Sequence, residues 1–207
     1  MQKGEFITLE GIEGAGKSSA VSCVADTMKL LGRNVIVTRE PGGTEIGEGI
    51  RNLILARHLT QMHAKTELLL MFAARAQHLE EVILPALGRG KCVICDRFTD
   101  ASYAYQGGGR GLKTDTVRQA ELLTHSELEP DTTLLLDVPG EIGLERVSKR
   151  GTIDRFEAES QKFFKSVRES YLKRAAEFPL RTIIIDASND LKAVHAEIRT
   201  TLRERYA

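Results

Sequence analysis

The sequence predicts an α/β fold in which a five-stranded parallel sheet carries helices on both faces. Short runs rich in Val, Ile and Leu recur along the 207 residues, and longer stretches with helical spacing separate them. The runs are apolar at consecutive positions, as strands are when both faces of a parallel sheet are covered. A hydrophobic content of 42% suits one compact domain over residues 1–207.

Five strands are expected, each bounded by polar or turn residues. They are "EFITLE" at 5–10, "NVIVT" at 34–38, "CVICD" at 92–96, "TTLLLD" at 132–137 and "RTIIID" at 181–186. Helical spacing predicts helices at about 17–31, 66–87, 114–127, 157–177 and 190–207. Two stretches interrupt this alternation and are expected to be loops, "REPGGTEIGEGIR" at 39–51 and "SKRGTIDRFE" at 148–157.

Composition limits the classes of partner. The 29 basic and 29 acidic side chains cancel, so bulk charge favours neither nucleic acid nor a membrane surface. The start, "MQKGEFITLE", lacks the apolar core of a signal peptide, and no apolar run approaches the roughly 20 residues that span a bilayer. Three cysteines are an odd number, which argues against a disulfide framework. We therefore expect a soluble cytoplasmic protein with reduced thiols.

A phosphate-binding loop follows the first strand. The segment "GIEGAGKS" matches G-x-x-x-x-G-K-[ST] between a strand and a helix, the context that this motif requires. Its backbone N–H groups and the helix N-terminus can bind the phosphates of ATP, whereas a glycine-rich tight turn is the structural alternative. Lys17 is expected to bridge the terminal phosphates, and the Ser18 hydroxyl to ligate Mg²⁺. The predicted ATP-binding residues of this segment are Gly11, Ile12, Glu13, Gly14, Ala15, Gly16, Lys17, Ser18 and Ser19.

A second acidic element for the metal lies at the end of the third strand. In "CVICDRF", Asp96 ends a buried run and would meet the loop at the edge of the sheet, holding Mg²⁺ directly or through water. Arg97 follows and could reach an acceptor phosphate, although an Asp-Arg pair also suits a solvated strand end. The segment "DVPG" at 137–140 fits the D-x-x-G of GTPases, but no N-K-x-D sequence accompanies it. A transferase is therefore favoured over a switch.

Further segments occur in a recognisable order. They are "EGIEGAGKS", "TREPGG", "FAAR", "DRF", "YAYQGGGRG" and "RGTIDRFE". With these segments the chain resembles the thymidylate kinases of the bacterial type over essentially its whole length. The resemblance implies a P-loop NTPase of the nucleoside monophosphate kinase type. It also implies a homodimer and Mg²⁺-dependent transfer of the ATP γ-phosphoryl group to dTMP, giving dTDP and ADP for dTTP biosynthesis. Another small-molecule P-loop kinase is the alternative.

The resemblance also implies the contacts with dTMP. They fall on Glu40, Arg51, Phe72, Arg75, Arg97, Ser102, Tyr103 and Gln106. Arg51 and Arg97 would grip the phosphate, because a guanidinium fork suits phosphate oxygens. Glu13 and Glu40 would lie near the acceptor sugar and phosphate, where a carboxylate must bind a hydroxyl, a water, Mg²⁺ or an arginine to avoid repulsion.

Base recognition is expected to combine stacking with hydrogen bonds, since a polar site rejects a base that leaves its groups unpaired. Phe72 would stack on thymine, and Arg75 would donate to a thymine carbonyl. Many relatives carry the aromatic residue four positions before the arginine, where this chain has Met71, so either side chain could cover the ring. Phe72 as ordinary core is a further alternative.

The segment at 102–106 would complete the acceptor site. Ser102 and Gln106 lie four positions apart on one helical face and match positions that bond the thymine imide. Tyr103 or Tyr105 would pack against the sugar.

The lid at about 146–157 would supply positive charge to the reaction. The phosphate loop carries the acid Glu13 and no basic residue before Lys17, and bacterial relatives with such a loop use lid arginines to stabilise the transferring phosphoryl group. Arg150 is expected first in this role and Arg155 second, while Arg146 could lie over adenine. A solvated charged face is the alternative. The implied catalytic residues are Lys17, Arg150, Arg155, Asp96 and Glu13.

Overall fold

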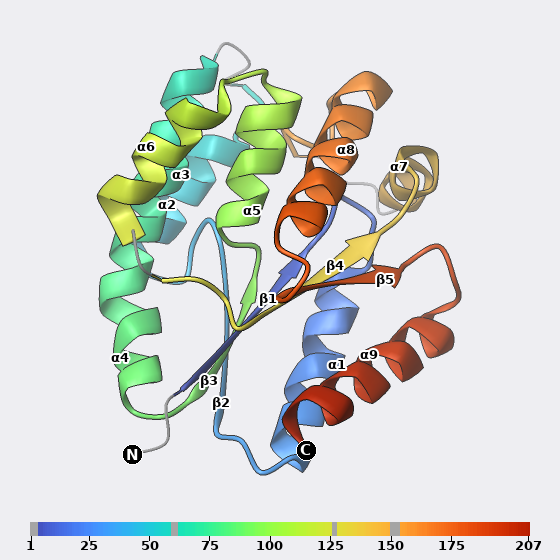
Figure 1. Ribbon diagram of the computed structural model, residues 1–207. Coiled ribbons are helices and arrows are strands. Elements are labelled where there is room, and N and C mark those ends of the chain that lie inside the picture. The colour runs from blue at the N-terminus through green and yellow to red at the C-terminus, as the bar shows by residue number, and fades with distance from the viewer. Residues whose placement is uncertain (1–3, 59–61, 126–127, 150–153) are drawn as a thin grey trace.

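The five predicted strands form one parallel sheet at the centre of the computed structural model, which describes residues 4–58, 62–125, 128–149 and 154–207 (Figure 1). The strands are β1 (Glu5–Glu10), β2 (Val35–Arg39), β3 (Cys92–Asp96), β4 (Thr132–Asp137) and β5 (Thr182–Asp186). Their spatial order is β2-β3-β1-β4-β5. The connection after β1 therefore leads to β2 at one edge of the sheet, whereas the connection after β3 leads to β4 on the other side of β1. Such a switch point opens a crevice at the carboxyl ends of β1 and β3.

Helices cover both faces of the sheet, as predicted. They are α1 (Lys17–Leu30), α2 (Glu45–Leu55), α3 (Ala64–His78), α4 (Leu84–Gly88), α5 (Thr99–Ser102), α6 (Thr114–His125), α7 (Gly140–Ser148), α8 (Gln161–Glu177) and α9 (Leu191–Tyr206). Two π-helical segments, η1 (Leu79–Ile83) and η2 (Tyr103–Gly109), join α3 to α4 and extend α5. Helices α1 and α9 lie side by side on one face, and α4 and α8 lie on the other (Figure 1).

Strand alternation explains this two-sided core. Ile7 and Leu9 of β1 point to the face of α1 and belong to the apolar cluster that contains Val24 and Met28. Phe6 points the other way and packs with Ile83 of η1 and with residues of α4. Because successive side chains of β1 alternate, Glu10 also points to this second face, toward α8.

Several helical features differ from the predictions. The stretch predicted as a loop at 39–51 contains most of α2, because the Thr44 hydroxyl accepts a hydrogen bond from Gly47 N at 3.0 Å and caps the helix despite its two glycines. The predicted helix at 66–87 changes to π-helix before Pro85, which has no N–H for the helical ladder. Helix α8 begins at Gln161, capped by Ser160, and residues just before it form turns. Helix α7 was not predicted.

The structure also bears on the expectations of reduced thiols and of a chain without a membrane-spanning segment. Cys23, Cys92 and Cys95 are all buried and free. Among the described residues, none of the helices has both the length and the apolar character that a bilayer crossing requires.

Candidate active site

A cavity of about 180 Å³ opens at the carboxyl end of the sheet, where the switch point predicts a crevice. Its walls come from the phosphate loop, the segment between β2 and α2, helix α3, the segment after β3, the 101–106 stretch and residues 154–157. Most of the predicted site residues line it: Glu13, Gly14, Gly16, Lys17, Ser18, Glu40, Arg51, Arg75, Asp96, Arg97, Ser102 and Gln106.

The phosphate loop turns from β1 into α1 through backbone conformations that glycine allows. Gly14 has φ 74°, and a Cβ atom there would lie 2.1 Å from the carbonyl oxygen of Gly143 on α7. Lys17 Nζ donates to the carbonyl oxygens of Gly11 and Ile12, at 3.1 and 3.0 Å. Burial and the neighbouring Arg97 lower the pKa of Lys17 to about 8. The loop therefore holds its ammonium group in the cavity with a third N–H donor left for an anion.

Several of the predicted ATP-binding residues do not line the cavity and instead pack in the core or bond to neighbouring elements. Ile12 and Ala15 are buried and belong to the core, so their side chains face away from the cavity. The Ser19 hydroxyl is 2.9 Å from His195 Nε2 of α9. Arg146 Nη1 donates to the carbonyl oxygen of Ala187 at 2.9 Å and lies 3.4 Å from that of Gly14. Arg146 thus sits on the outer side of the loop, beside the turn at 186–188.

Arg97 and Glu13 form a charged pair at the mouth of the loop. Arg97 follows β3 with φ 72°, and its guanidinium donates to the Gly11 carbonyl at 2.9 Å and to Glu13 Oε1 at 2.9 Å. The Tyr105 hydroxyl donates to the other Glu13 oxygen at 2.6 Å, and the Arg97 guanidinium lies 4.7 Å from the centre of the Tyr105 ring. Glu13 is therefore held through both of its carboxylate oxygens, by Arg97 and by Tyr105.

Asp96, the residue before Arg97, carries a buried carboxylate oxygen in the same cavity. Its Oδ1 atom is buried and has no hydrogen-bond partner among the residues that the structure describes. The Ser18 hydroxyl lines the same cavity. A buried carboxylate oxygen without a donor requires an ion or an ordered water.

Arg75 is held by three hydrogen bonds at the wall of the cavity. It is 2% exposed and donates through Nε to Glu40 Oε2 at 2.6 Å, through Nη1 to Ser102 Oγ at 3.0 Å and through Nη2 to the Phe98 carbonyl at 3.0 Å. His78 Nδ1 lies 3.0 Å from the other Glu40 oxygen. Burial alone would raise the pKa of Glu40, but Arg75 and His78 together lower it below its usual value. Glu40 is thus an ionised partner that positions Arg75.

Phe72 does not face the cavity, contrary to the expectation that it stacks on a base there. It is 3% exposed, packs with Leu68 and Tyr103, and stacks on His125 with ring centres 6.3 Å apart. Met71 lines the cavity in its place. Both residues neighbour Arg75, at three and four positions before it, but the packing of α3 turns the Phe72 ring into the apolar cluster with Leu68 and Tyr103.

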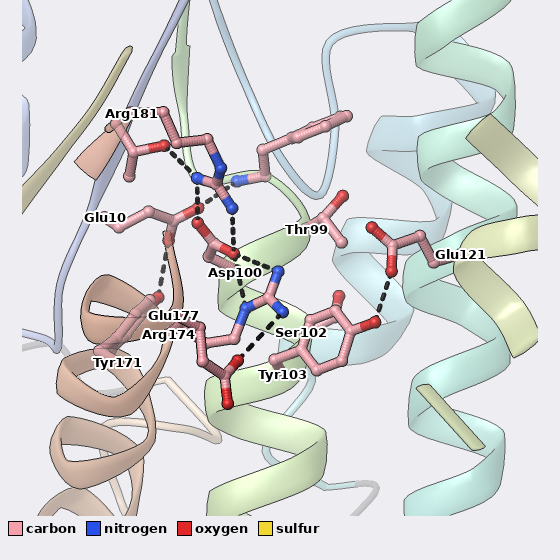
Figure 2. A network of polar contacts seen from close by, with 12 residues as sticks. Glu10, Thr99, Asp100, Ser102, Tyr103, Glu121, Tyr171, Arg174, Glu177 and Arg181 are labelled. Atoms are coloured by element: carbon pink, nitrogen blue, oxygen red, sulfur yellow. Dashed lines mark hydrogen bonds and ion pairs between the residues drawn. The ribbon is translucent and has the colours of Figure 1, made fainter. Parts of the chain in front are cut away.

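Tyr103 also points away from the cavity, so the sugar contact predicted for it is not possible in this geometry. Figure 2 shows its hydroxyl directed at Glu121 of α6, to which it donates. The Arg174 guanidinium covers its ring at 4.0 Å. Tyr105, the alternative named for this role, lines the cavity.

Of the two lid arginines predicted to act in catalysis, the structure describes only Arg155. Arg150 lies outside the described residues. Arg155 is 8% exposed and turns away from the phosphate loop, because its Nε donates to the Ile54 carbonyl at 2.7 Å and its Nη2 is 2.7 Å from Glu67 Oε2. Residues that sequence reasoning missed, among them Phe98, Asp154, Phe156 and Glu157, line the cavity. The "DRF" and "DRFE" segments contain all four, but the prediction used only Asp96, Arg97 and Arg155 from them.

A buried polar network supports the cavity from behind (Figure 2). Asp100 of α5 accepts from Arg174 Nε at 3.0 Å and from Arg181 Nη1 at 2.7 Å. Glu10 accepts from Tyr171 at 2.7 Å, and the same Tyr171 hydroxyl accepts from Arg97 Nη1 at 3.1 Å. Helix α8 is thereby tied both to α5 and to the arginine of the cavity.

Glu10 should make stability depend on pH. Burial and then Asp100 raise its pKa from 4.5 to about 7, outweighing the charge of Arg97 and the hydrogen bonds that favour the ionised carboxylate. The contribution of Glu10 is fully present below pH 4.5 and is lost as the pH rises through 7. The shift corresponds to roughly 3 kcal/mol. Urea unfolding should therefore show the free energy of unfolding of the wild type, relative to Glu10→Gln, falling by up to that amount between pH 4.5 and 8. A pH-independent difference would contradict the assignment.

Comparison with known proteins gives the family. The thymidylate kinase family model matches residues 9–198. The thymidylate kinase of Nitrosospira multiformis is 52% identical over 205 residues, 99% of this chain and 100% of that protein. The thymidylate kinase of Pseudomonas entomophila is 54% identical over 199 residues, 96% of this chain and 95% of that protein. The crystal structure of thymidylate kinase from Ehrlichia chaffeensis, 32% identical, superposes with a TM-score of 0.78 over 97% of this chain and 99% of that one. The chain therefore belongs to the thymidylate kinase family.

Proposed function

We propose that the chain transfers the γ-phosphoryl group of ATP to dTMP within this cavity, giving dTDP and ADP. The observation that carries the proposal is that Lys17 and Arg97 donate to the same carbonyl, that of Gly11, at 3.1 and 2.9 Å. Lys17 belongs to the ATP loop, and Arg97 belongs to the segment predicted to hold the acceptor phosphate. Two phosphates bound by these cations would meet where transfer requires them, and the cations would offset their repulsion.

The donor side is formed by the loop and α1. Backbone N–H groups of residues 11–16 and the N-terminus of α1 would bind the phosphates of ATP, with Lys17 bridging the terminal ones. Arg146, at the turn 186–188, would lie beside the adenine.

The acceptor side is formed by α3 and the segments after β2 and β3. Arg97 and Arg51 would hold the dTMP phosphate, and both line the cavity. Arg75, Ser102 and Gln106 would bond the thymine edge. Met71 would cover the ring, with Phe72 packing beneath Arg75 at 4.5 Å from its guanidinium. Glu13 and Tyr105, joined by their hydrogen bond, would lie along the sugar.

Mg²⁺ fits the residues at the junction of the two sides. The unpaired Asp96 Oδ1 atom and the Ser18 hydroxyl are hard oxygen donors in one cavity, the kind that this ion prefers. Asp96 and Ser18 would hold it, directly or through water. When bound, the ion supplies positive charge to the phosphate oxygens.

The lid would complete the site through Arg150, and Arg155 would anchor it. Replacing Arg150 by alanine should lower kcat by about 100-fold with little change in the KM for dTMP, because a group that stabilises transferred charge acts in the transition state. Steady-state kinetics would show this split. The control is Lys173→Ala on α8, because Lys173 lies outside the lid, is 76% exposed and is 3.9 Å from Glu177. Full activity in Arg150→Ala would assign the charge to another residue.

We also propose that the enzyme works as a homodimer in the cytoplasm. The outer sides of α2 and α3 carry exposed apolar residues, with Ile46, Leu53 and Leu69 exposed by 58, 44 and 63%. Such side chains suit contact with a second copy. Sedimentation equilibrium should give twice the chain mass.

A coupled ADP-release assay with different nucleoside monophosphates tests the proposed function. Turnover is expected with dTMP, weak turnover with dUMP, and none with dCMP or dGMP, since the cavity presents fixed polar groups to one base edge. Equal rates for all four would refute the proposed roles of Arg75, Ser102 and Gln106, and turnover of a different acceptor alone would identify another P-loop kinase.

A further inference from the structure

Behind the Gln106 side of the cavity lies a carboxylate that no motif identifies, that of Glu67 on α3. It is fully buried, with 0% of its surface exposed. Its Oε1 accepts from Gln106 Nε2 at 2.8 Å, and its Oε2 accepts from Arg110 Nε at 3.1 Å and pairs with Arg155 Nη2 at 2.7 Å. A buried carboxylate requires such partners, and Glu67 has one on each neighbouring segment.

The contact with Glu67 determines which end of the Gln106 amide faces the cavity. A carboxylate beside two guanidinium groups can only accept hydrogen bonds, so it can bind the NH₂ end of the amide and would repel the oxygen end. Gln106 is 1% exposed and lines the cavity, and none of the described residues donates to its Oε1. With its NH₂ group turned to Glu67, the amide presents its oxygen, an acceptor, on the opposite side.

We propose that Glu67 is a positioning residue for base specificity, because it orients Gln106 so that the cavity accepts a base with an N–H donor and rejects one with an acceptor there. The inference rests on the proposed function, in which Gln106 bonds the thymine edge. Thymine carries a hydrogen on N3, whereas N3 of cytosine is an acceptor. Against cytosine, the oriented amide would place two acceptors face to face, which leaves both without a donor.

Replacement of Glu67 by glutamine should turn the amide of Gln106 around. The new side chain has one oxygen, and the two arginines require it, so its NH₂ group would face Gln106. The Gln106 oxygen must then turn toward that NH₂ group, and its own NH₂ group would face the cavity and suit cytosine. The ratio of kcat/KM for dTMP to that for dCMP should fall by about 100-fold. This ratio is independent of how much of the variant is folded.

Two matched variants test whether a change in the ratio comes from the orientation of the Gln106 amide or from another effect of the substitution. Glu159→Gln removes the same charge from the same cluster, because Glu159 pairs with Arg110 Nη1 at 2.5 Å, but in the structure Glu159 makes no hydrogen bond to Gln106. Its ratio should equal that of the wild type. Gln106→Met removes the amide that bonds the base. The dTMP-to-dCMP ratio of kcat/KM should fall in this variant, but kcat/KM for dCMP should not rise.

The outcomes distinguish the inference from the proposed function. If the dTMP-to-dCMP ratio of kcat/KM fell in Gln106→Met but stayed at the wild-type value in Glu67→Gln, the inference alone would be overturned. The inference would also be overturned if Glu159→Gln lowered this ratio as much as Glu67→Gln does. A wild-type ratio in Gln106→Met would overturn the proposed base site.

A measurement on the wild type covers the case in which Glu67→Gln does not fold. The side-chain NH₂ signals of Gln106 in a ¹⁵N NMR spectrum can be assigned by their loss in Gln106→Met. They should be protected from hydrogen exchange before any nucleotide is added, because they are bonded to a buried carboxylate. Exchange at the rate of an exposed amide, with protection gained only on addition of dTMP, would contradict the orientation and overturn the inference.

Discussion

Replacing Lys17 by methionine should lower kcat by about 1,000-fold, because preorganised positive charge at the transferring phosphoryl group is the main contribution that the protein makes to this reaction. Methionine keeps an unbranched side chain of similar length but has no charge and no donors. Lys17 is also poised by its surroundings, since two loop carbonyls hold Nζ and burial lowers its pKa to about 8. Initial rates of ADP release at saturating ATP and dTMP would measure the loss.

The control for this variant is Lys173→Met on α8. Its side chain is 76% exposed and lies 3.9 Å from Glu177, so the same chemical change at that position should leave kcat as in the wild type. Thermal unfolding of both variants would show that each is folded. A Lys17→Met enzyme within tenfold of the wild type would mean that Lys17 does not act on the reacting phosphates.

Replacing Arg97 by alanine should lower kcat/KM for dTMP by about 1,000-fold and change the affinity for an ATP analogue much less. Removing one member of a buried charge pair costs about 2–5 kcal/mol, and here Glu13 would also lose its partner. Calorimetric titration with dTMP and, separately, with a non-hydrolysable ATP analogue would give the two affinities.

Arg97→Lys tests the geometry of the same position. Lysine keeps the charge but has no planar fork, so it should recover only part of the dTMP affinity. Equal losses for dTMP and the ATP analogue in Arg97→Ala would show that Arg97 supports the loop and does not distinguish the acceptor.

The sheet and the phosphate loop were predictable because their signals are local. Each strand is a continuous apolar run, and the loop motif is a single segment between a strand and a helix. The meeting of Asp96 with the loop followed from topology, because parallel strands place their carboxyl ends at one edge. Helix α2 was missed because Gly47 and Gly49 lower helix propensity, whereas the cap at Thr44 and packing on α3 determine the outcome.

The directions of individual side chains were less predictable. Phe72 and Met71 differ by one position, and only the packing of α3 decides which of them faces the cavity. Arg155 is paired with Glu67, a residue 88 positions away in sequence, and no local pattern indicates such a partner. Glu67 is the single acid of α3 and is followed by the apolar run 68–74, and its role depends on three segments that meet only in the fold.

A crystal structure with Mg²⁺, dTMP and a non-hydrolysable ATP analogue would test the central claim most directly. The account predicts thymine at Arg75 and Gln106, the dTMP phosphate on Arg97, and the terminal phosphate of the analogue on Lys17, with the metal between Asp96 and Ser18. A dTMP molecule bound away from Arg75 and Arg97, or a terminal phosphate out of reach of Lys17, would contradict it.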